Sequence, residues 1–312
     1  MKSAKNKTID ISLKEGKEYL NRCLQVKSKT ALNNILNKTI IGDSLKVMSK
    51  LPTGFVDLLI VDPPYNLSKN FHGNKFTKTS TAEYQKYTQN WVTKVIPLLK
   101  PNASIYVCCD WLSSMIIAPI LEQHFNIINR ITWQREKGRG SAKNWKNGME
   151  DIWFATNGKN YTFNLNNVKI RRKVLAPYKK DGQPKDWEET TDGRFRNTCP
   201  SNFWDDISIP YWSMPENTAH PTQKPEKLIA KLILASSNPN DVIFDPFLGS
   251  GTTSVTAKKL GRKYVGIEQN SQYCIWAEKR LELADKNPQS QGYFNGIFLE
   301  RNTSIRSTKN KN

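Results

Sequence analysis

The stretch Val242-Ile-Phe-Asp-Pro-Phe-Leu-Gly-Ser-Gly-Thr-Thr253 decides the fold, because it leads from a short apolar strand through a glycine loop into a helix. Gly249 and Gly251 let backbone N–H groups approach a ligand, and the start of the following helix favours a negative group. Glu268 ends the next predicted strand, where a carboxylate can bind ribose hydroxyls. Taken alone, Gly-x-Gly is also compatible with a plain structural turn.

The complete pattern narrows the class of ligand. A nicotinamide dinucleotide site would place a third glycine where this chain has Ser254, and the Asp-Pro-Phe lead-in does not fit such a site either. Strand, Asp245, glycine loop, helix and Glu268 together suit a nucleoside that carries a zwitterionic amino-acid tail. We therefore expect S-adenosylmethionine as the cofactor.

A second motif, Asp62-Pro-Pro-Tyr65, directly follows the apolar run Asp57–Val61. The carboxyl ends of parallel strands are where α/β proteins bind ligands, and Pro63 and Pro64 stiffen the turn. The Asp62 carboxylate and the Pro63 carbonyl can accept hydrogen bonds from the two hydrogens of an amino group. A strand-ending turn without chemistry is the alternative interpretation.

Acceptors of this kind would activate a poor nucleophile. The lone pair of the amino group on adenine or cytosine is delocalised into the ring, and a positioned pair of acceptors localises it for attack on a sulfonium methyl. The base cannot be reached inside a duplex, so it must be flipped out. Tyr65 can stack on the flipped base. Trp133, at the end of a predicted strand, is a second stacking candidate, although a core position suits it equally.

Strands and helices alternate along the chain, which predicts the α/β class with a Rossmann-like, mostly parallel, doubly wound sheet. We expect strands at 40–41, 57–61, 103–109, 126–134, 151–156, 242–245 and 264–268, and helices at 83–99, 112–124, 225–236, 252–260 and 272–284.

This rhythm is lost between residues 157 and 219, where Asn, Gly, Pro and charged residues interrupt it and an inserted recognition region is expected. The predicted organisation is a polar N-terminal extension (1–37), a catalytic half (38–156), the insert (157–219), a cofactor-binding half (220–286) and a polar C-terminal tail (287–312).

Composition excludes several classes. The 312 residues include 38% hydrophobic residues, enough for a folded core, yet no apolar run is long enough to span a bilayer, and the N-terminus lacks the apolar segment of a signal peptide. The five cysteines are scattered and form no C-x-x-C pair, which argues against a zinc site or a disulfide framework. We expect a cytoplasmic protein that binds no metal and no membrane.

The formal net charge is +19, from 47 Lys and Arg against 28 Asp and Glu. Residues 130–185 alone contain 14 basic and 4 acidic residues, with aromatic residues between them. Basic groups mixed with rings suit a phosphate backbone and unstacked bases, which favours a nucleic acid as partner. A solvated surface without a partner is the alternative.

Four motifs in this order resemble those of the amino-methyltransferases of bacterial restriction–modification systems: Gly42-Asp-Ser44, Asp62-Pro-Pro-Tyr-Asn66, His220-Pro-Thr-Gln-Lys-Pro225 and Asp245-Pro-Phe-Leu-Gly-Ser-Gly-Thr-Thr253. The resemblance extends from about residue 40 to residue 284. The position of Asp-Pro-Pro-Tyr ahead of the glycine loop resembles the permuted β class. The resemblance implies a Rossmann-like, S-adenosylmethionine-dependent methyltransferase fold in which the insert reads the DNA sequence.

The resemblance also implies roles for single residues. Asp43 and Ser44 would hold the cofactor adenine, Phe247 would pack near the cofactor, and four further residues would bind the methionine carboxylate. For Lys224 the alternative is solvation of a helix start. The expected catalytic residues are Asp62, Pro63, Pro64 and Tyr65, and the expected cofactor-binding residues are Asp43, Ser44, Thr222, Lys224, Asp245, Phe247, Gly249, Ser250, Gly251, Thr252 and Glu268.

Basic residues in three segments would contact DNA. One segment, 66–79, would close over the flipped base, a second basic loop follows residue 134, and the third is the insert. The expected DNA-binding residues are Lys69, Lys75, Arg135, Arg139, Lys143, Arg171, Arg172, Lys173, Arg194 and Arg196.

The expected function is site-specific methylation of adenine N6 in double-stranded DNA by a type II modification enzyme, because Asp at the first position of the tetrapeptide favours adenine in this family. Cytosine N4 is the alternative target. Glutamine amides in proteins, RNA bases, and a catalytically inactive DNA-binding module are further alternatives. The resemblance also allows a cognate restriction endonuclease that acts separately, and a homodimer.

Overall fold

The computed structural model describes residue 3 and residues 5–71, 74–135, 142–174, 178–191, 193–290, 292–294 and 296–298. Among these residues, eight strands form a central sheet in the order β1-β15-β14-β2-β5-β7-β6-β13. Its strands are β1 (Lys38–Ile41), β15 (Lys263–Glu268), β14 (Val242–Asp245), β2 (Val56–Val61), β5 (Leu99–Cys109), β7 (Met149–Thr156), β6 (Asn126–Gln134) and β13 (Phe203–Trp204).

The direction of the strands confirms the predicted mostly parallel sheet. β7 is antiparallel to its neighbours β5 and β6, and the other neighbouring pairs of the central sheet are parallel. β2 and β14 lie side by side, with Leu58 opposite Ile243 and Leu59 opposite Phe244. The two strands that precede the two sequence motifs are therefore direct neighbours.

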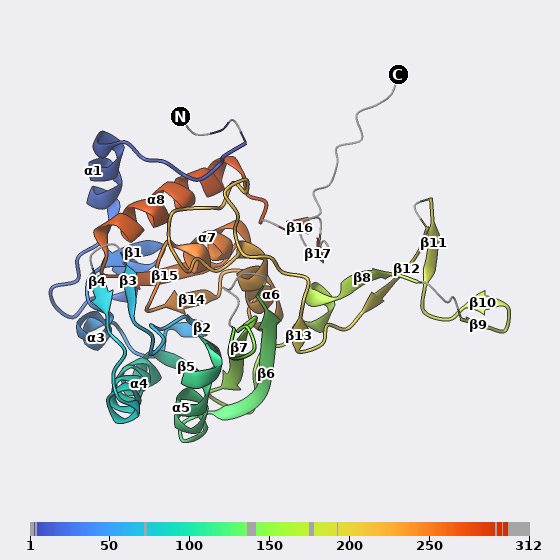
Figure 1. Ribbon diagram of the computed structural model, residues 1–312, viewed down its shortest axis with the longest axis horizontal. Coiled ribbons are helices and arrows are strands. Elements are labelled where there is room, and N and C mark those ends of the chain that lie inside the picture. The colour runs from blue at the N-terminus through green and yellow to red at the C-terminus, as the bar shows by residue number, and fades with distance from the viewer. Residues whose placement is uncertain are drawn as a thin grey trace.

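Helices cover both faces of the sheet (Figure 1), as expected for a doubly wound fold. One face carries α2 (Leu32–Ile35), α3 (Ser44–Val47), η1 (Met48–Lys50), α4 (Thr81–Val95), η2 (Ile96–Leu98) and α5 (Trp111–Glu122). The other face carries α6 (Glu226–Ser236), α7 (Thr252–Lys259) and α8 (Ser271–Lys286). In the described part of the chain, none of the helices is both long enough and apolar enough to cross a membrane.

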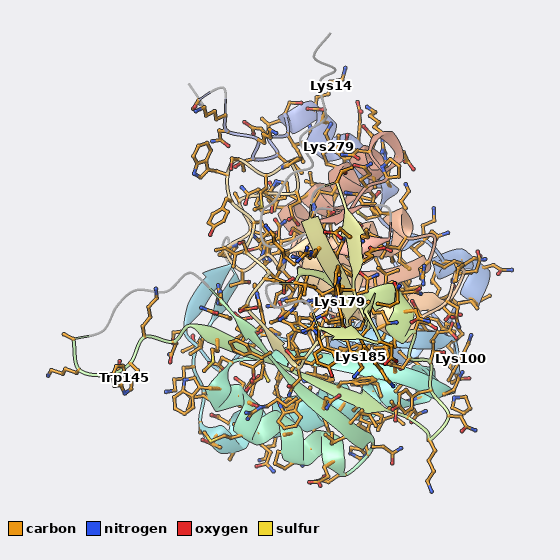
Figure 2. All side chains as sticks on the ribbon, turned by 90° about the vertical axis from the view of Figure 1, so that its right-hand side faces the viewer. Lys14, Lys100, Trp145, Lys179, Lys185 and Lys279 are labelled. Carbon is orange, nitrogen blue, oxygen red and sulfur yellow. The ribbon has the colours of Figure 1, made fainter. Side chains whose placement is uncertain are left out.

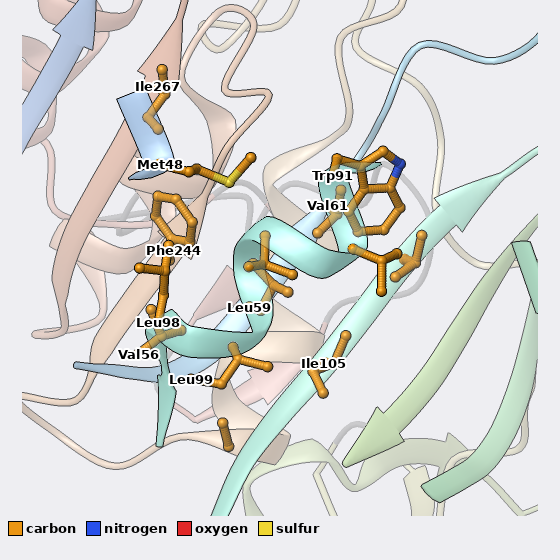
Figure 3. Close-up of a cluster of buried hydrophobic side chains, with 14 of the residues drawn as sticks. Met48, Val56, Leu59, Val61, Trp91, Leu98, Leu99, Ile105, Phe244 and Ile267 are labelled. Atoms are coloured by element: carbon orange, nitrogen blue, oxygen red, sulfur yellow. The ribbon is translucent and has the colours of Figure 1, made fainter. Parts of the chain in front are cut away.

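Alternating side chains of the strands supply both cores. In β2, Leu59 and Val61 pack on the α4 side with Trp91, whereas Leu58 and Ile60 pack on the α6 side. Figure 3 shows the first of these clusters around Leu59. Complete burial of one leucine stabilises the fold by about 1.5–3 kcal/mol. Because β2 buries side chains on both of its faces, we expect its position in the sheet to be fixed.

Helix α4 illustrates where sequence boundaries and structure differ. The predicted helix 83–99 begins earlier, at Thr81, because Ser80 and Glu83 form a reciprocal capping box. It ends earlier, at Val95, and a short η2 turn containing Pro97 follows it. Proline cannot donate the backbone hydrogen bond that would continue the helix, so the chain turns directly into β5.

A three-stranded antiparallel unit projects from the body (Figure 1). It consists of β8 (Ile170–Lys173), β12 (Gly193–Thr198) and β11 (Glu188–Thr190), with a hairpin of β9 (Lys179–Lys180) and β10 (Gln183–Pro184) at its end. We call residues 170–198 the β-arm. It lies within the predicted insert 157–219. The remainder of that insert contains η3 (Leu165–Val168) and β13, which joins the central sheet beside β6.

The C-terminal segment joins the β-arm, which the sequence did not indicate. β16 (Tyr293–Phe294) and β17 (Ile297–Phe298) form a hairpin, and β17 lies parallel to β8 with Phe298 opposite Ile170. Phe298 is buried against Val168 and Leu234 of α6. Part of the predicted polar tail therefore fastens the base of the arm to the body.

The N-terminal extension is also built into the fold. Its helix α1 (Leu13–Arg22) packs on α8, with ion pairs of 2.9 Å between Arg22 and Glu282 and 3.3 Å between Lys279 and Glu15. Ahead of α1, the backbone N–H of Lys7 donates to the carbonyl of Trp212. A second short hairpin, β3 (Lys69–Phe71) and β4 (Asn74–Phe76), follows β2.

Gly251 should be more sensitive to substitution than other glycines in left-handed backbone. Its φ is +87°, and an added Cβ would lie 2.7 Å from the Ala277 Cα of α8. Gly261 has a similar φ of +72° but no neighbour within 4 Å of such a Cβ. We expect Gly251→Ala to lower the free energy of unfolding by at least about 2 kcal/mol more than Gly261→Ala, as measured by urea denaturation. Equal losses would contradict this packing argument.

Candidate active site

One pocket, with a volume of about 350 Å³, contains both sequence motifs. It lies at the edge of the sheet where β2, β14 and β15 end, because Asp62, Asp245 and Glu268 follow or end these strands and line it. The pocket is lined by every expected catalytic residue and by each expected cofactor-binding residue except Gly251. Gly251 stands directly behind it, at the start of α7.

Asp62 is held from two sides. The Tyr65 hydroxyl donates to Asp62 Oδ1 at 2.8 Å, and Lys224 Nζ donates to Asp62 Oδ2 at 2.7 Å. Burial raises the pKa of Tyr65 well above its usual value, and the negative charges of Asp62 and Glu150 raise it further. Tyr65 is therefore a neutral donor that fixes the orientation of the carboxylate.

Lys224 lies between two carboxylates. Its side chain is 8% exposed, and its Nζ is also 3.2 Å from Glu150 Oε2. Burial alone lowers the pKa of Lys224, but Asp62 and Glu150 outweigh this effect and hold the pKa above its usual value. The ammonium therefore stays charged in the folded protein. Arg135 forms an ion pair with the other oxygen of Glu150, Oε1.

Glu150 is a site residue that sequence reasoning missed. The argument from strand ends applies to parallel strands, whereas β7 is antiparallel to its neighbours. The start of β7, not its end, therefore lies at the edge that carries the site. The available signal was a carboxylate at the start of the run Met149-Glu-Asp-Ile-Trp153, next to residues that are otherwise suited to a buried strand.

Carboxylates also shape the glycine loop. Asp245 accepts hydrogen bonds from the Thr253 hydroxyl at 2.6 Å and from the Phe247 N–H at 2.9 Å. Glu268 Oε2 accepts from the Gly249 N–H at 2.8 Å. Burial raises the pKa of Asp245 to about 7 and also raises the pKa of Glu268.

The loop 216–225 packs directly on the glycine loop. A Cβ at Gly249 would lie 3.1 Å from His220 Nε2, and the His220 ring meets the Tyr273 ring edge-on at 4.3 Å. The Thr222 N–H donates to His220 Nδ1 at 3.3 Å. The hydroxyl of Thr252 donates to the Lys224 carbonyl at 3.0 Å. His220 and Thr252 thus connect the loop 216–225 with the glycine loop.

Trp133 does not lie at the site, so the prediction that it stacks on the target base is wrong. Its side chain is 1% exposed in the core on the α6 side, and its indole N–H donates to the Ile207 carbonyl at 2.8 Å. The strand β6 ends at the sheet edge one residue later, but Trp133 points into the core between the sheet and its covering helices. Trp133 is therefore a core residue, which is the alternative that the sequence left open.

The predicted DNA-binding residues have different surroundings. Arg135 is engaged by Glu150, as described above. In the β-arm, Arg171 pairs with Glu188 at 2.6 Å, and Arg194 and Arg196 also pair with carboxylates. Lys143, Arg172 and Lys173 are exposed. Arg139 and the side chains of Lys69 and Lys75 lie outside the described part of the structure.

A mostly parallel, doubly wound sheet with both motifs at one edge defines the Rossmann-like class of α/β proteins. Among solved structures, the cytosine-N4-specific PvuII DNA methyltransferase has a TM-score of 0.59 at 18% identity, over 86% of this chain and 95% of that chain. TTHA0409 from Thermus thermophilus, solved with S-adenosyl-L-methionine, has a TM-score of 0.53 at 19% identity, over 85% and 98%. These similarities support the fold.

Sequence comparison gives the family. The model of the DNA methylases of the N6/N4 methyltransferase type matches residues 56–279. DNA adenine methyltransferase YhdJ from Escherichia coli (strain K12) is 36% identical over 260 residues, which are 79% of this chain and 83% of the relative. Type II methyltransferase M.HpaI from Haemophilus parainfluenzae is 32% identical over 250 residues, 78% of this chain and 74% of the relative. The chain belongs to the N6/N4 DNA methylase family.

Asp245 should make stability depend on pH. Its pKa of about 7 in the folded protein lies above the value of about 3.9 in an unfolded chain, so the folded state holds a proton that the unfolded state has lost. Its contribution to stability is therefore complete below about pH 4 and is lost as the pH rises to about 7. Relative to Asp245→Asn, the wild type should lose more than about 1 kcal/mol of unfolding free energy between about pH 5 and about pH 8 in chemical denaturation. Parallel pH profiles of the two proteins would contradict the raised pKa.

Proposed function

We propose that this protein transfers a methyl group from S-adenosylmethionine to N6 of an adenine that is flipped out of double-stranded DNA. The observation that supports this proposal best is the single pocket that contains both Asp62 and the glycine loop. A methyl group can pass from a bound cofactor to an amino group only if the two are held side by side. The acceptor Asp62 and the glycine loop must therefore line the same pocket.

The residues of the pocket fit the proposed cofactor. The Ser250 hydroxyl is buried and has no hydrogen-bond partner among the described residues, so it can serve a polar ligand group. Glu268 ends β15, where a carboxylate suits ribose hydroxyls, while Asp43 and Phe247 line the same pocket. When bound, S-adenosylmethionine supplies a methyl group on a positively charged sulfur.

The chain itself would position the target base. Asp62 and the carbonyl of Pro63 accept hydrogen bonds from the amino group, which keeps its lone pair on nitrogen and directed at the donor. Tyr65, oriented by its hydrogen bond to Asp62, offers its ring to the flipped base. After transfer, the extra proton of the amino group passes to solvent or to Asp62.

Adenine is favoured over cytosine by two observations. The tetrapeptide begins with Asp62, and the relative YhdJ, at 36% identity, is named a DNA adenine methyltransferase. Cytosine N4 is the second candidate, because the similar PvuII structure is cytosine-N4-specific. We further propose that the protein acts in a restriction–modification system with a separate endonuclease, since the relative M.HpaI is named a type II methyltransferase.

Base identity can be measured directly. The purified chain should transfer radiolabelled methyl groups from S-adenosylmethionine to unmethylated DNA of high sequence complexity. Nuclease digestion and mass spectrometry should then find N6-methyladenine, and sequencing that detects modified bases should give the recognition site. N4-methylcytosine as the product would replace the favoured target by the second candidate, and unlabelled DNA would overturn the proposed function.

Asp62→Ala should separate catalysis from cofactor binding. We expect the rate of methyl transfer to fall by about a thousandfold or more, because the amino group loses its acceptor. The affinity for S-adenosylmethionine, measured by calorimetry, should stay within about twofold, because Asp62 is held by Tyr65 and Lys224 and its hydrogen bonds do not support the glycine loop. Asp285→Ala removes an exposed carboxylate of α8 and serves as the control. An active Asp62→Ala variant would remove Asp62 from the mechanism.

Arg172 is our candidate for a DNA contact on the β-arm. It stands opposite Arg196 on one face of the arm, and the described residues contain no ion-pair partner for it. Arg172→Gln should weaken binding to the recognition site and reduce the slope of log affinity against log salt by about one. Lys14→Gln is the control, since Lys14 of α1 lies well apart from Lys179 and Lys185 of the arm in Figure 2. Equal slopes for both variants would place the contact elsewhere.

A further inference from the structure

Four buried or half-buried polar groups at the site form a closed ring of contacts. Lys224 Nζ lies 2.7 Å from Asp62 Oδ2 and 3.2 Å from Glu150 Oε2. The Tyr65 hydroxyl lies 2.8 Å from Asp62 Oδ1 and 3.3 Å from Glu150 Oε2. The ring therefore contains two carboxylates, one ammonium and one hydroxyl.

This ring restricts the access of a base amino group to Asp62. Both carboxylate oxygens of Asp62 already accept a hydrogen bond, one from Tyr65 and one from Lys224. The bond from Lys224 joins two charged groups and is stronger than the bond that a neutral amino group of a base can offer. Each carboxylate oxygen can accept a second hydrogen bond, so an incoming amino group must either bind Asp62 beside the ammonium or take the place that the ammonium occupies.

We infer that Glu150 is a positioning residue that retains the Lys224 ammonium when the target base arrives, so that Asp62 becomes available to the amino group. The inference rests on the proposed function and deepens it. A buried ammonium that leaves one carboxylate needs another, because an unpaired charge in this environment is costly. Among the described residues, Glu150 is the second carboxylate in ion-pair contact with Lys224.

Glu150 is suited to this task by its own surroundings. Arg135 binds Glu150 Oε1, which leaves Oε2 for Lys224. Its backbone is fixed in β7, where it lies opposite Trp133 in the register with β6. A short shift of the flexible lysine side chain toward Oε2 therefore suffices, with no change of the backbone.

Glu150→Gln tests the inference, because it retains the size of the side chain and removes the charge that holds Lys224. The ammonium should then remain on Asp62. We expect the single-turnover rate of methyl transfer to fall by about tenfold or more, while the affinity for S-adenosylmethionine changes by less than about twofold. The fluorescence of 2-aminopurine placed beside the target adenine should also rise less on binding, since fewer bases are held flipped out.

Asp206→Asn is the matched control. Asp206 also pairs with two cations, Lys227 at 2.9 Å and Lys231 at 3.3 Å, but neither of these lysines lines the pocket, whereas Lys224 does. We expect its rate to stay within about twofold of the wild type at a temperature where both variants are folded. A loss equal to that of Glu150→Gln would show a general effect of removing an internal ion pair and would overturn the inference.

A double substitution distinguishes positioning from a structural role of Glu150. If Glu150 acts through Lys224, then Glu150→Gln should change the rate by less than about twofold in a Lys224→Met background. An undiminished tenfold loss in that background would overturn the inference. So would a large loss of affinity for S-adenosylmethionine in Lys224→Met, which would place Lys224 on the cofactor instead.

Failure of the inference and failure of the proposed function give different results. If the wild type methylates DNA and Glu150→Gln does so equally fast, the positioning role is wrong and the proposed function stands. If the wild type transfers no methyl group to any DNA, the proposed function fails, and the inference fails with it.

Discussion

The pairing of β2 with β14 is the constraint on which the site depends. These strands come from opposite halves of the chain, yet Leu58 lies opposite Ile243 and Leu59 opposite Phe244. This pairing brings Asp62 and Asp245 to the same edge of the sheet, because each stands at the carboxyl end of its strand. Both strands are buried on both faces, so their relative position is fixed by the two cores that also support the helices. A shift of one residue in the register would place core side chains on the wrong faces of the sheet.

The charged groups of the site are buried, and burial makes each of them costly. Lys224, Glu150 and Asp245 lie away from water, where an unpaired charge is unfavourable. The protein meets this cost by pairing: Lys224 is shared between two carboxylates, and Arg135 neutralises Glu150. Asp245 instead accepts two hydrogen bonds, and burial raises its pKa to about 7. The result is a pocket whose polar groups are oriented before any ligand binds, which lowers the reorganisation needed for chemistry.

The sequence predicted the parts of the site that follow parallel strands and failed where other rules apply. Asp62, Asp245 and Glu268 were predicted correctly as neighbours because each follows or ends a short apolar strand, and these three strands are parallel. Glu150 was missed because β7 runs the other way, and only pairing shows that direction. Trp133 was left open between the site and the core, since a strand end places a residue near an edge but does not say which face it occupies. The β17 strand has two residues, too few for any periodicity, and it pairs with β16 and with β8.

The ion pairs of the β-arm suggest how it can be stable both with and without a polyanion. Arg194 and Arg196 pair with Glu189 and Asp186 while each remains about half exposed. Exposed pairs of this kind contribute about 0.2–1 kcal/mol each, so exchanging a carboxylate for a phosphate costs the arm little stability. The arm does not rely on these pairs for its attachment, because buried Phe298 and Val168 hold its base against α6. Its arginines can therefore change partners while the backbone that presents them stays in place.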